Sequence, residues 1–92
     1  MPIYECLDYL LNHLHNNRFK PAGQRVPFDV DHIVIPTLQL QNHEEFIGLM
    51  DMLIEDKYAN CLWDWGNPSL DEYRSRVMIT PRGIDFLGKG GY

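Results

Sequence analysis

The sequence predicts an α+β fold in which a helical core precedes a β-hairpin and a short terminal helix. Three observations predict it. Apolar residues recur with helical spacing over residues 2–16 and 42–58. Apolar and polar residues alternate over residues 73–79, after a cluster of turn formers. Thr80 and Pro81 then form a typical helix start.

Composition indicates a globular protein that acts in the cytoplasm. Hydrophobic residues make up 45% and charged residues 23% of the 92 residues, which argues against disorder. No stretch reaches the roughly 20 apolar residues of a membrane-spanning helix, and no signal peptide is recognised. Cys6 and Cys61 do not form a paired motif, so we expect reduced, buried thiols. This length predicts a single domain over residues 1–88, followed by a flexible tail over 89–92.

The first predicted helix runs from Pro2 to about Asn16. Pro2 suits a first helical position because its missing N–H group is not needed there. Asn16 and Asn17 can end the helix, since asparagine tolerates a left-handed backbone. The residues that share one face of the helix are Ile3, Leu7, Leu10, Leu11 and Leu14.

Residues 18–41 have no clear period. Pro21, Gly23 and Pro27 indicate loops or turns. The β-branched run over 33–35 favours a brief buried strand. Pro36 either ends that run or opens a short helix that continues to Leu40.

The second long helix is predicted from Asn42 to about Tyr58. Asn42 suits the N-cap, and Glu45 stands three residues later in the capping-box position. Seven apolar residues cover one half of its helical wheel. The residues on the other half are Glu44, Gly48, Asp51, Met52 and Glu55.

A β-hairpin is predicted next. The period changes toward that of a strand around Leu62 and Trp65, and residues 66–69 are turn formers. The second strand is expected over Tyr73 to Ile79, with Arg74 and Arg76 on one face. Thr80 is then expected to cap a helix that starts at Pro81 and ends at Gly88.

This order of elements resembles a winged-helix domain. The residues that carry the resemblance lie in the second half of the chain: Leu53-Ile54-Glu55-Asp56-Lys57-Tyr58-Ala59-Asn60-Cys61-Leu62, then Tyr73 to Ile79, then Thr80-Pro81-Arg82-Gly83-Ile84-Asp85-Phe86-Leu87. The glycine that many members have before the first wing strand is replaced by Lys57 or Ala59. The chain is also similar to small bacterial winged-helix proteins of unassigned role, some of which continue into a membrane anchor. The resemblance implies that the helix at 42–57 takes the place of a DNA recognition helix.

Charge opposes that implied role. The formal net charge is −5, and residues 42–60 carry five acidic residues against one lysine. Carboxylates facing phosphates oppose DNA binding. We therefore expect a protein-interaction or dimerisation module, in which the acidic helix face is either plain solvated surface or a contact for a basic partner. The candidate contact residues are Glu44, Asp51, Met52, Glu55, Trp63, Trp65 and Tyr73.

A DNA-binding regulator is the alternative. In that interpretation the wing arginines Arg74 and Arg76, together with Arg82, contact the DNA backbone. No enzyme activity, metal site or cofactor is predicted. His13 and His15, for example, are two residues apart on a helix and point about 160° apart around its axis, which prevents them from sharing a metal.

Overall fold

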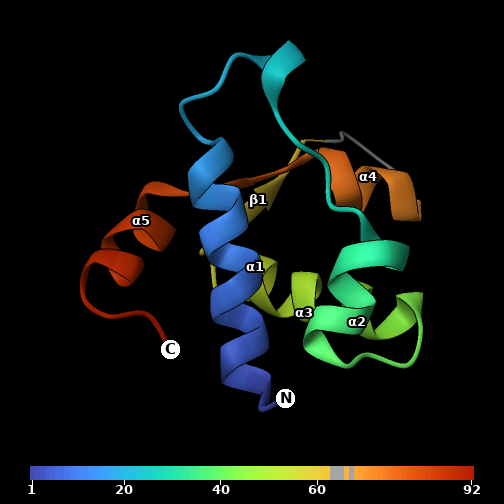
Figure 1. Ribbon diagram of the computed structural model, residues 1–92. Helices are drawn as coiled ribbons and strands as arrows, with labels where there is room; N and C mark the ends of the chain where they lie inside the picture. Colours follow the sequence, from blue (N-terminus) through green and yellow to red (C-terminus); the bar gives the residue numbers. More distant parts are fainter. Residues whose placement is uncertain (63–65, 67) are drawn as a thin grey trace.

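The computed structural model describes residues 1–62, 66 and 68–92, and within them the fold is α+β (Figure 1). The helical elements are α1 (Ile3–Asn17), the short 3₁₀ turn η1 (Ala22–Gln24), the π-helical turn η2 (Val30–Val34), α2 (Ile35–Leu38), α3 (His43–Glu55), α4 (Leu70–Ser75) and α5 (Pro81–Gly88). The strands are β1 (Ala59–Cys61) and β2 (Val77–Ile79). In these residues no helix has the length and apolar character needed to cross a membrane.

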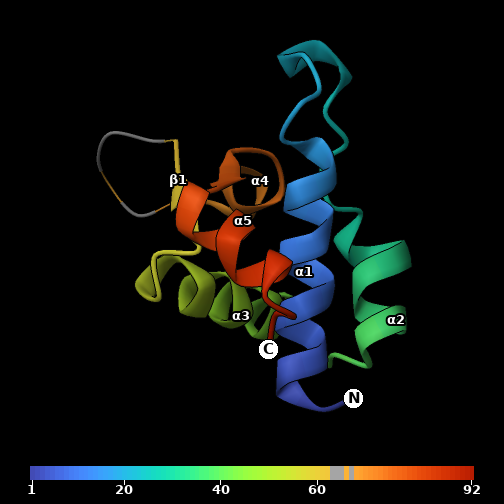
Figure 2. The same ribbon diagram turned by 90° about the vertical axis from the view of Figure 1, so that its left-hand side faces the viewer.

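Helix α1 is the centre of the molecule. It stands between α2 on one side and α5 on the other, and it packs against α3 and β2 (Figures 1 and 2). Leu7, Leu10, Leu11 and Leu14 on its predicted apolar face are all buried. Ile3, predicted on the same face, is 48% exposed because the first turn of α1 extends to the edge of the core.

The two strands pair antiparallel, with Asn60 opposite Met78 at the centre of the register. The second strand is shorter than the sequence predicts, and the prediction was wrong for residues 73–75. These residues belong to α4, and Ser69 accepts the first backbone hydrogen bonds of that helix. Asp71 in the first turn of α4 and Arg74 in its last turn match the helix dipole, which favours the helix over an extended strand.

The β-branched run at 33–35 is not a strand. It lies in η2 and at the start of α2, so the helix alternative at Pro36 holds in part: α2 begins at Ile35 and ends at Leu38, before the expected end at Leu40. Val30, Val34 and Leu38 recur at intervals of four residues and are all buried. Burial of this helical face explains why a run with high strand propensity forms turns of helix.

The predicted caps of α3 and α5 are confirmed. The Asn42 side chain accepts from the Glu45 backbone N–H at 3.0 Å, and Thr80 Oγ1 accepts from the Gly83 N–H at 3.0 Å. Gly83 also lets α5 lie close to the end of α3. A Cβ atom at that position would overlap the carbonyl oxygen of Tyr58.

The last residues of the chain pack against α1, where the sequence predicts a flexible tail over 89–92. The Tyr92 backbone N–H donates to Asp8 Oδ1 at 2.9 Å, and its hydroxyl donates to Asp56 Oδ2 at 3.3 Å. The Tyr92 ring stacks on Tyr4 and meets the Phe86 ring edge-on. Gly91, at φ 70°, makes the turn that places this ring.

Candidate interaction groove and charged surfaces

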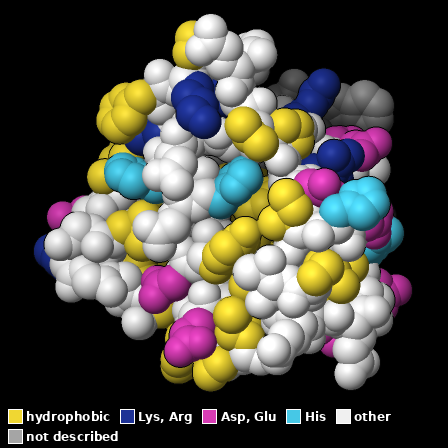
Figure 3. Space-filling model, in the orientation of Figure 1, with side chains coloured by type: hydrophobic (Ala, Val, Ile, Leu, Met, Phe, Trp, Pro, Cys, Tyr) yellow, Lys and Arg dark blue, Asp and Glu magenta, His cyan; other side chains and the backbone are white. Residues whose placement is uncertain are grey.

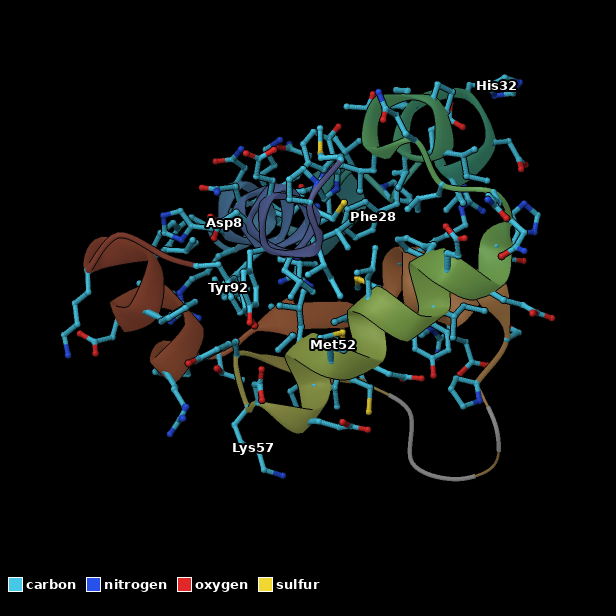
Figure 4. All side chains as sticks on the ribbon, turned by 90° about the horizontal axis from the view of Figure 1, so that it is seen from below. Asp8, Phe28, His32, Met52, Lys57 and Tyr92 are labelled. Carbon is cyan, nitrogen blue, oxygen red and sulfur yellow. The ribbon has the colours of Figure 1, made fainter. Side chains whose placement is uncertain are left out.

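An open groove of about 370 Å³ lies between the N-terminal end of α1, the segment after α2, and α3. At the lower end of the face in Figure 3, hydrophobic side chains lie next to Asp and Glu side chains. Figure 4, which shows the molecule from below, places Met52 on α3. The groove is lined by Met1, Ile3, Cys6, Leu40, Glu45, Gly48, Leu49 and Met52.

The floor and the walls of the groove are apolar. Cys6 and Leu49 are buried beneath it, while Met52 and Leu40 are half-buried. Gly48 leaves the groove open, because no atom lies within 4 Å of the position that its Cβ would occupy. Flexible methionine side chains let such a surface adapt to a bound apolar group.

Glu45 lines this groove, and the Glu5 carboxylate and the N-terminal amine lie near it. Burial raises the pKa of the Cys6 thiol, and the nearby Glu5 and Glu45 carboxylates raise it further, against an opposing effect of the N-terminal amine. Glu45 is held in place because its Oε2 accepts from the Gln41 backbone N–H at 3.1 Å. Glu44 is exposed in the same first turn of α3.

The predicted contact residues of α3 separate into two groups. Glu44 and Glu55 are exposed, and Met52 lines the groove. Asp51 instead faces α4, where it accepts from the Tyr73 hydroxyl at 2.7 Å. Burial, together with this hydrogen bond, raises the pKa of Tyr73 to about 12.

Tyr73 is therefore not part of an exposed aromatic patch. It is 7% exposed and packs in the core. The expected contact residues Trp63 and Trp65 lie outside the described residues. An aromatic contact surface around the hairpin accordingly has no support from Tyr73.

The three predicted arginines do not lie on one strand or helix. Arg74 lies on α4, where its Nε donates to the Phe28 carbonyl and its Nη1 to Asp71, each at 2.8 Å. Arg76 is exposed just after α4, between that helix and β2. The guanidinium of Arg82, on α5, lies 5.3 Å from the centre of the Tyr58 ring.

Most of the residues that line the groove were not predicted from the sequence. Gly48 is the one available signal, since it leaves a gap on the face of α3 that was predicted to be exposed. Ile3, Cys6 and Leu40 come from segments that only the tertiary structure brings together. Among the described residues, no three His, Cys, Asp or Glu side chains lie close enough to hold a metal ion.

Comparison with known proteins identifies no relative: no family, no curated protein and no solved structure matches this chain.

Proposed function

We propose that this protein is an interaction module that binds a partner protein in the groove between α1 and α3. The occupant is an apolar segment of the partner that carries Lys or Arg beside its apolar side chains. The observation that supports this proposal is the combination of an apolar floor with the carboxylates of Glu45, which lines the groove, and Glu5, which lies near it.

Each part of the groove has a role in this function. Apolar partner side chains replace water above Leu49 and Met52, which stabilises the complex. Basic partner side chains meet Glu5, Glu44 and Glu45 at the edge of the groove. This attraction favours a basic partner segment over an acidic one. Glu45, already fixed by Gln41, loses little freedom on binding.

The fold proposed for this module is winged-helix-like. The order of α1, α2, α3 and an antiparallel β1–β2 pair supports it, with α3 in the position of the recognition helix. Helix α4, between the two strands, is a departure from a simple wing.

Two features speak against the alternative, a DNA-binding regulator. The exposed carboxylates of Glu44 and Glu55 on α3 repel phosphates. Arg74, the first of the two wing arginines, is bound to Asp71 and to the Phe28 carbonyl. Because Asp71 neutralises its charge, Arg74 is a poor contact for the phosphates of a DNA backbone.

The test compares two glycine substitutions of equal chemistry. Gly48→Gln fills the groove, whereas Gly88→Gln places the same side chain on α5, and neither position has an atom within 4 Å of the added Cβ. The probes are a helical peptide of Leu and Lys and the matched peptide of Leu and Glu, titrated by fluorescence anisotropy. Neither substitution changes the net charge of the protein.

We expect the wild type to bind the Lys peptide and to bind the Glu peptide at least tenfold more weakly. Gly48→Gln is expected to weaken binding of the Lys peptide at least tenfold, and Gly88→Gln to leave it unchanged. Equal loss in both variants, or none in either, would overturn the proposal. Dimerisation of the wild type that Gly48→Gln abolishes would assign the groove to a second copy instead. Tight, salt-sensitive binding of random duplex DNA would favour the regulator.

A further inference from the structure

A second pocket, of about 200 Å³, lies at the opposite end of α1 from the groove. It is formed by the last turns of α1, by residues 25–28, and by α4 and β2. Three arginines line it, namely Arg18, Arg25 and Arg74. Figure 3 shows Lys and Arg side chains in the upper half of the molecule, the half in which the chain leaves α1.

Two of these arginines carry charge that no described carboxylate neutralises. Arg25 Nε donates to the Lys20 carbonyl at 3.3 Å, and its Nη1 contacts the Met78 sulfur at 3.5 Å. These neutral partners orient the guanidinium and leave its charge available. The Arg18 guanidinium lies 5.5 Å from the centre of the Phe19 ring and makes no ion pair within the described chain. Arg74 differs, because Asp71 pairs with it.

Hydrogen bonds and a ring contact hold the wall between these arginines. His13 Nε2 donates to the Val26 carbonyl at 2.8 Å, and its ring stacks on Phe28 with 4.0 Å between ring centres. Asn17 donates to the same carbonyl and accepts from the Val26 N–H. These contacts hold residues 26–28 against α1, so the pocket exists before any ligand binds.

The charge of the pocket comes from its arginines and not from histidine. Burial lowers the pKa of His13, which favours the neutral ring near pH 7. The neutral ring donates from Nε2 to Val26, so its role is to hold the wall in place. Arg18 and Arg25, which form no ion pair with the described residues, thus line a space whose other walls include Phe28, Val26 and Met78.

We infer that this pocket binds a small phosphomonoester, with Arg18 and Arg25 on the phosphate and the apolar wall against the organic part. A phosphomonoester carries close to two negative charges near neutral pH, which matches two guanidinium groups. Guanidinium donors also fit phosphate oxygens in pairs. The volume is below the roughly 300–1,000 Å³ of pockets for drug-sized ligands, so the organic part has only a few carbon atoms.

The experiment is a calorimetric titration of the whole chain with glycerol 3-phosphate at about pH 7, where the phosphate is mostly dianionic. Inorganic phosphate, glycerol and dimethyl phosphate serve as the comparison ligands. Dimethyl phosphate is a diester with one negative charge, and it stands in for a nucleic-acid backbone. The variants Arg18→Gln and Arg25→Gln each remove one charge from the pocket. Arg82→Gln removes the same charge from α5 and serves as the matched control.

We expect saturable binding of glycerol 3-phosphate, weaker binding of inorganic phosphate, and none of glycerol. Arg18→Gln and Arg25→Gln are each expected to weaken binding at least tenfold, with Arg82→Gln unchanged. The Arg18 side chain makes no hydrogen bond within the described residues, so its variant keeps the test valid even if loss of the Arg25 contacts perturbs folding. Absence of saturable binding, or an equal loss with Arg82→Gln, would overturn the inference. Equal affinity for dimethyl phosphate would also overturn it and would point to a nucleic-acid backbone.

Discussion

Lys57 occupies a backbone position that glycine usually takes. It follows α3 with φ at 68°, and the flanking hydrogen bonds from Tyr58 to Leu53 and from Lys57 to Ile54 form a Schellman motif. The Lys57 side chain projects away from the fold (Figure 4). It is exposed, so no packing offsets the cost of a left-handed conformation at a residue with a Cβ atom.

Replacement of this lysine by glycine should stabilise the protein. We expect Lys57→Gly to raise the free energy of unfolding by about 1 kcal/mol, because glycine adopts the left-handed backbone without steric cost. The measurement is urea denaturation. Lys57→Ala is the control, since it removes the side chain but keeps the Cβ atom, and it should leave stability nearly unchanged. A gain with alanine equal to that with glycine would contradict this explanation.

His13 should make stability depend on pH in the mildly acidic range. Burial lowers its pKa in the folded protein, whereas the unfolded chain has a pKa of about 6.5. The unfolded state therefore binds the proton first. The stability that neutral His13 provides is complete above about pH 6.5 and is lost as the pH falls toward the lower folded pKa.

The check is the urea midpoint between about pH 7.5 and 5, a range that spans the unfolded His13 pKa. The wild type should lose stability on acidification more steeply than His13→Phe, which keeps a ring against Phe28 but cannot be protonated. Absolute stability of the variant differs through loss of the Val26 hydrogen bond, so the slopes are compared. Parallel slopes would show that His13 does not titrate differently in the folded protein.

At the scale of elements, α5 is joined to the segment after α3 through one residue, Thr80. Thr80 Oγ1 accepts from the Gly83 N–H and donates to the Lys57 carbonyl, while the Thr80 N–H donates to Tyr58. The hydroxyl therefore starts α5 and also holds this helix beside the turn that leads into β1.

Loss of this hydroxyl should lower the stability of the protein, because α5 is a short helix that depends on its cap. Thr80→Ala is expected to lower the free energy of unfolding by about 1–2 kcal/mol, since it removes an N-cap and a second hydrogen bond. Thr80→Ser keeps both bonds and should retain most of the stability. Thermal melts of the two variants provide the comparison. An alanine variant as stable as the serine variant would show that the cap contributes nothing.

At the scale of the whole molecule, the C-terminal end of the chain packs against α1. The two proposed sites lie at opposite ends of this helix and differ in charge. Tyr92 reaches back to Asp8, and the two lie next to each other in Figure 4. The acidic groove lies at the start of α1, and the arginine pocket lies at its end. The two proposed sites are thus separated, and a ligand in one leaves the other open.

Closure by Tyr92 should contribute to global stability. Tyr92→Ala removes the ring that contacts Tyr4, Tyr58 and Phe86, and we expect a loss of about 2 kcal/mol in the free energy of unfolding. Tyr92→Phe keeps the ring and loses only the exposed bond to Asp56, so its effect should be below about 0.5 kcal/mol. Urea denaturation distinguishes the two. Equal midpoints for alanine and wild type would mean that the chain end does not support the core.

The sequence by itself determined the elements whose signals are local. Helices α1 and α3 follow from apolar period, and the starts of α3 and α5 follow from Asn42 and Thr80, because a cap acts within one turn of its own chain. The α+β class follows from these helices and from the predicted second strand, of which residues 77–79 form β2, whereas the first strand, expected around Leu62 and Trp65, is observed at Ala59–Cys61.

Only the tertiary structure decided the rest. Residues 70–75 form a helix that buries Tyr73 against Asp51, although their alternation also fits a strand. The residues predicted on the acidic face of α3 likewise have different surroundings. Asp51 accepts a hydrogen bond from Tyr73 of α4, whereas Met52 lines a groove with Ile3 and Leu40. Short segments carry too few residues to distinguish a period of two from one of 3.6, so burial against partners distant in sequence determines them. A groove or pocket has the same origin, because its walls come from segments that meet only when the core packs.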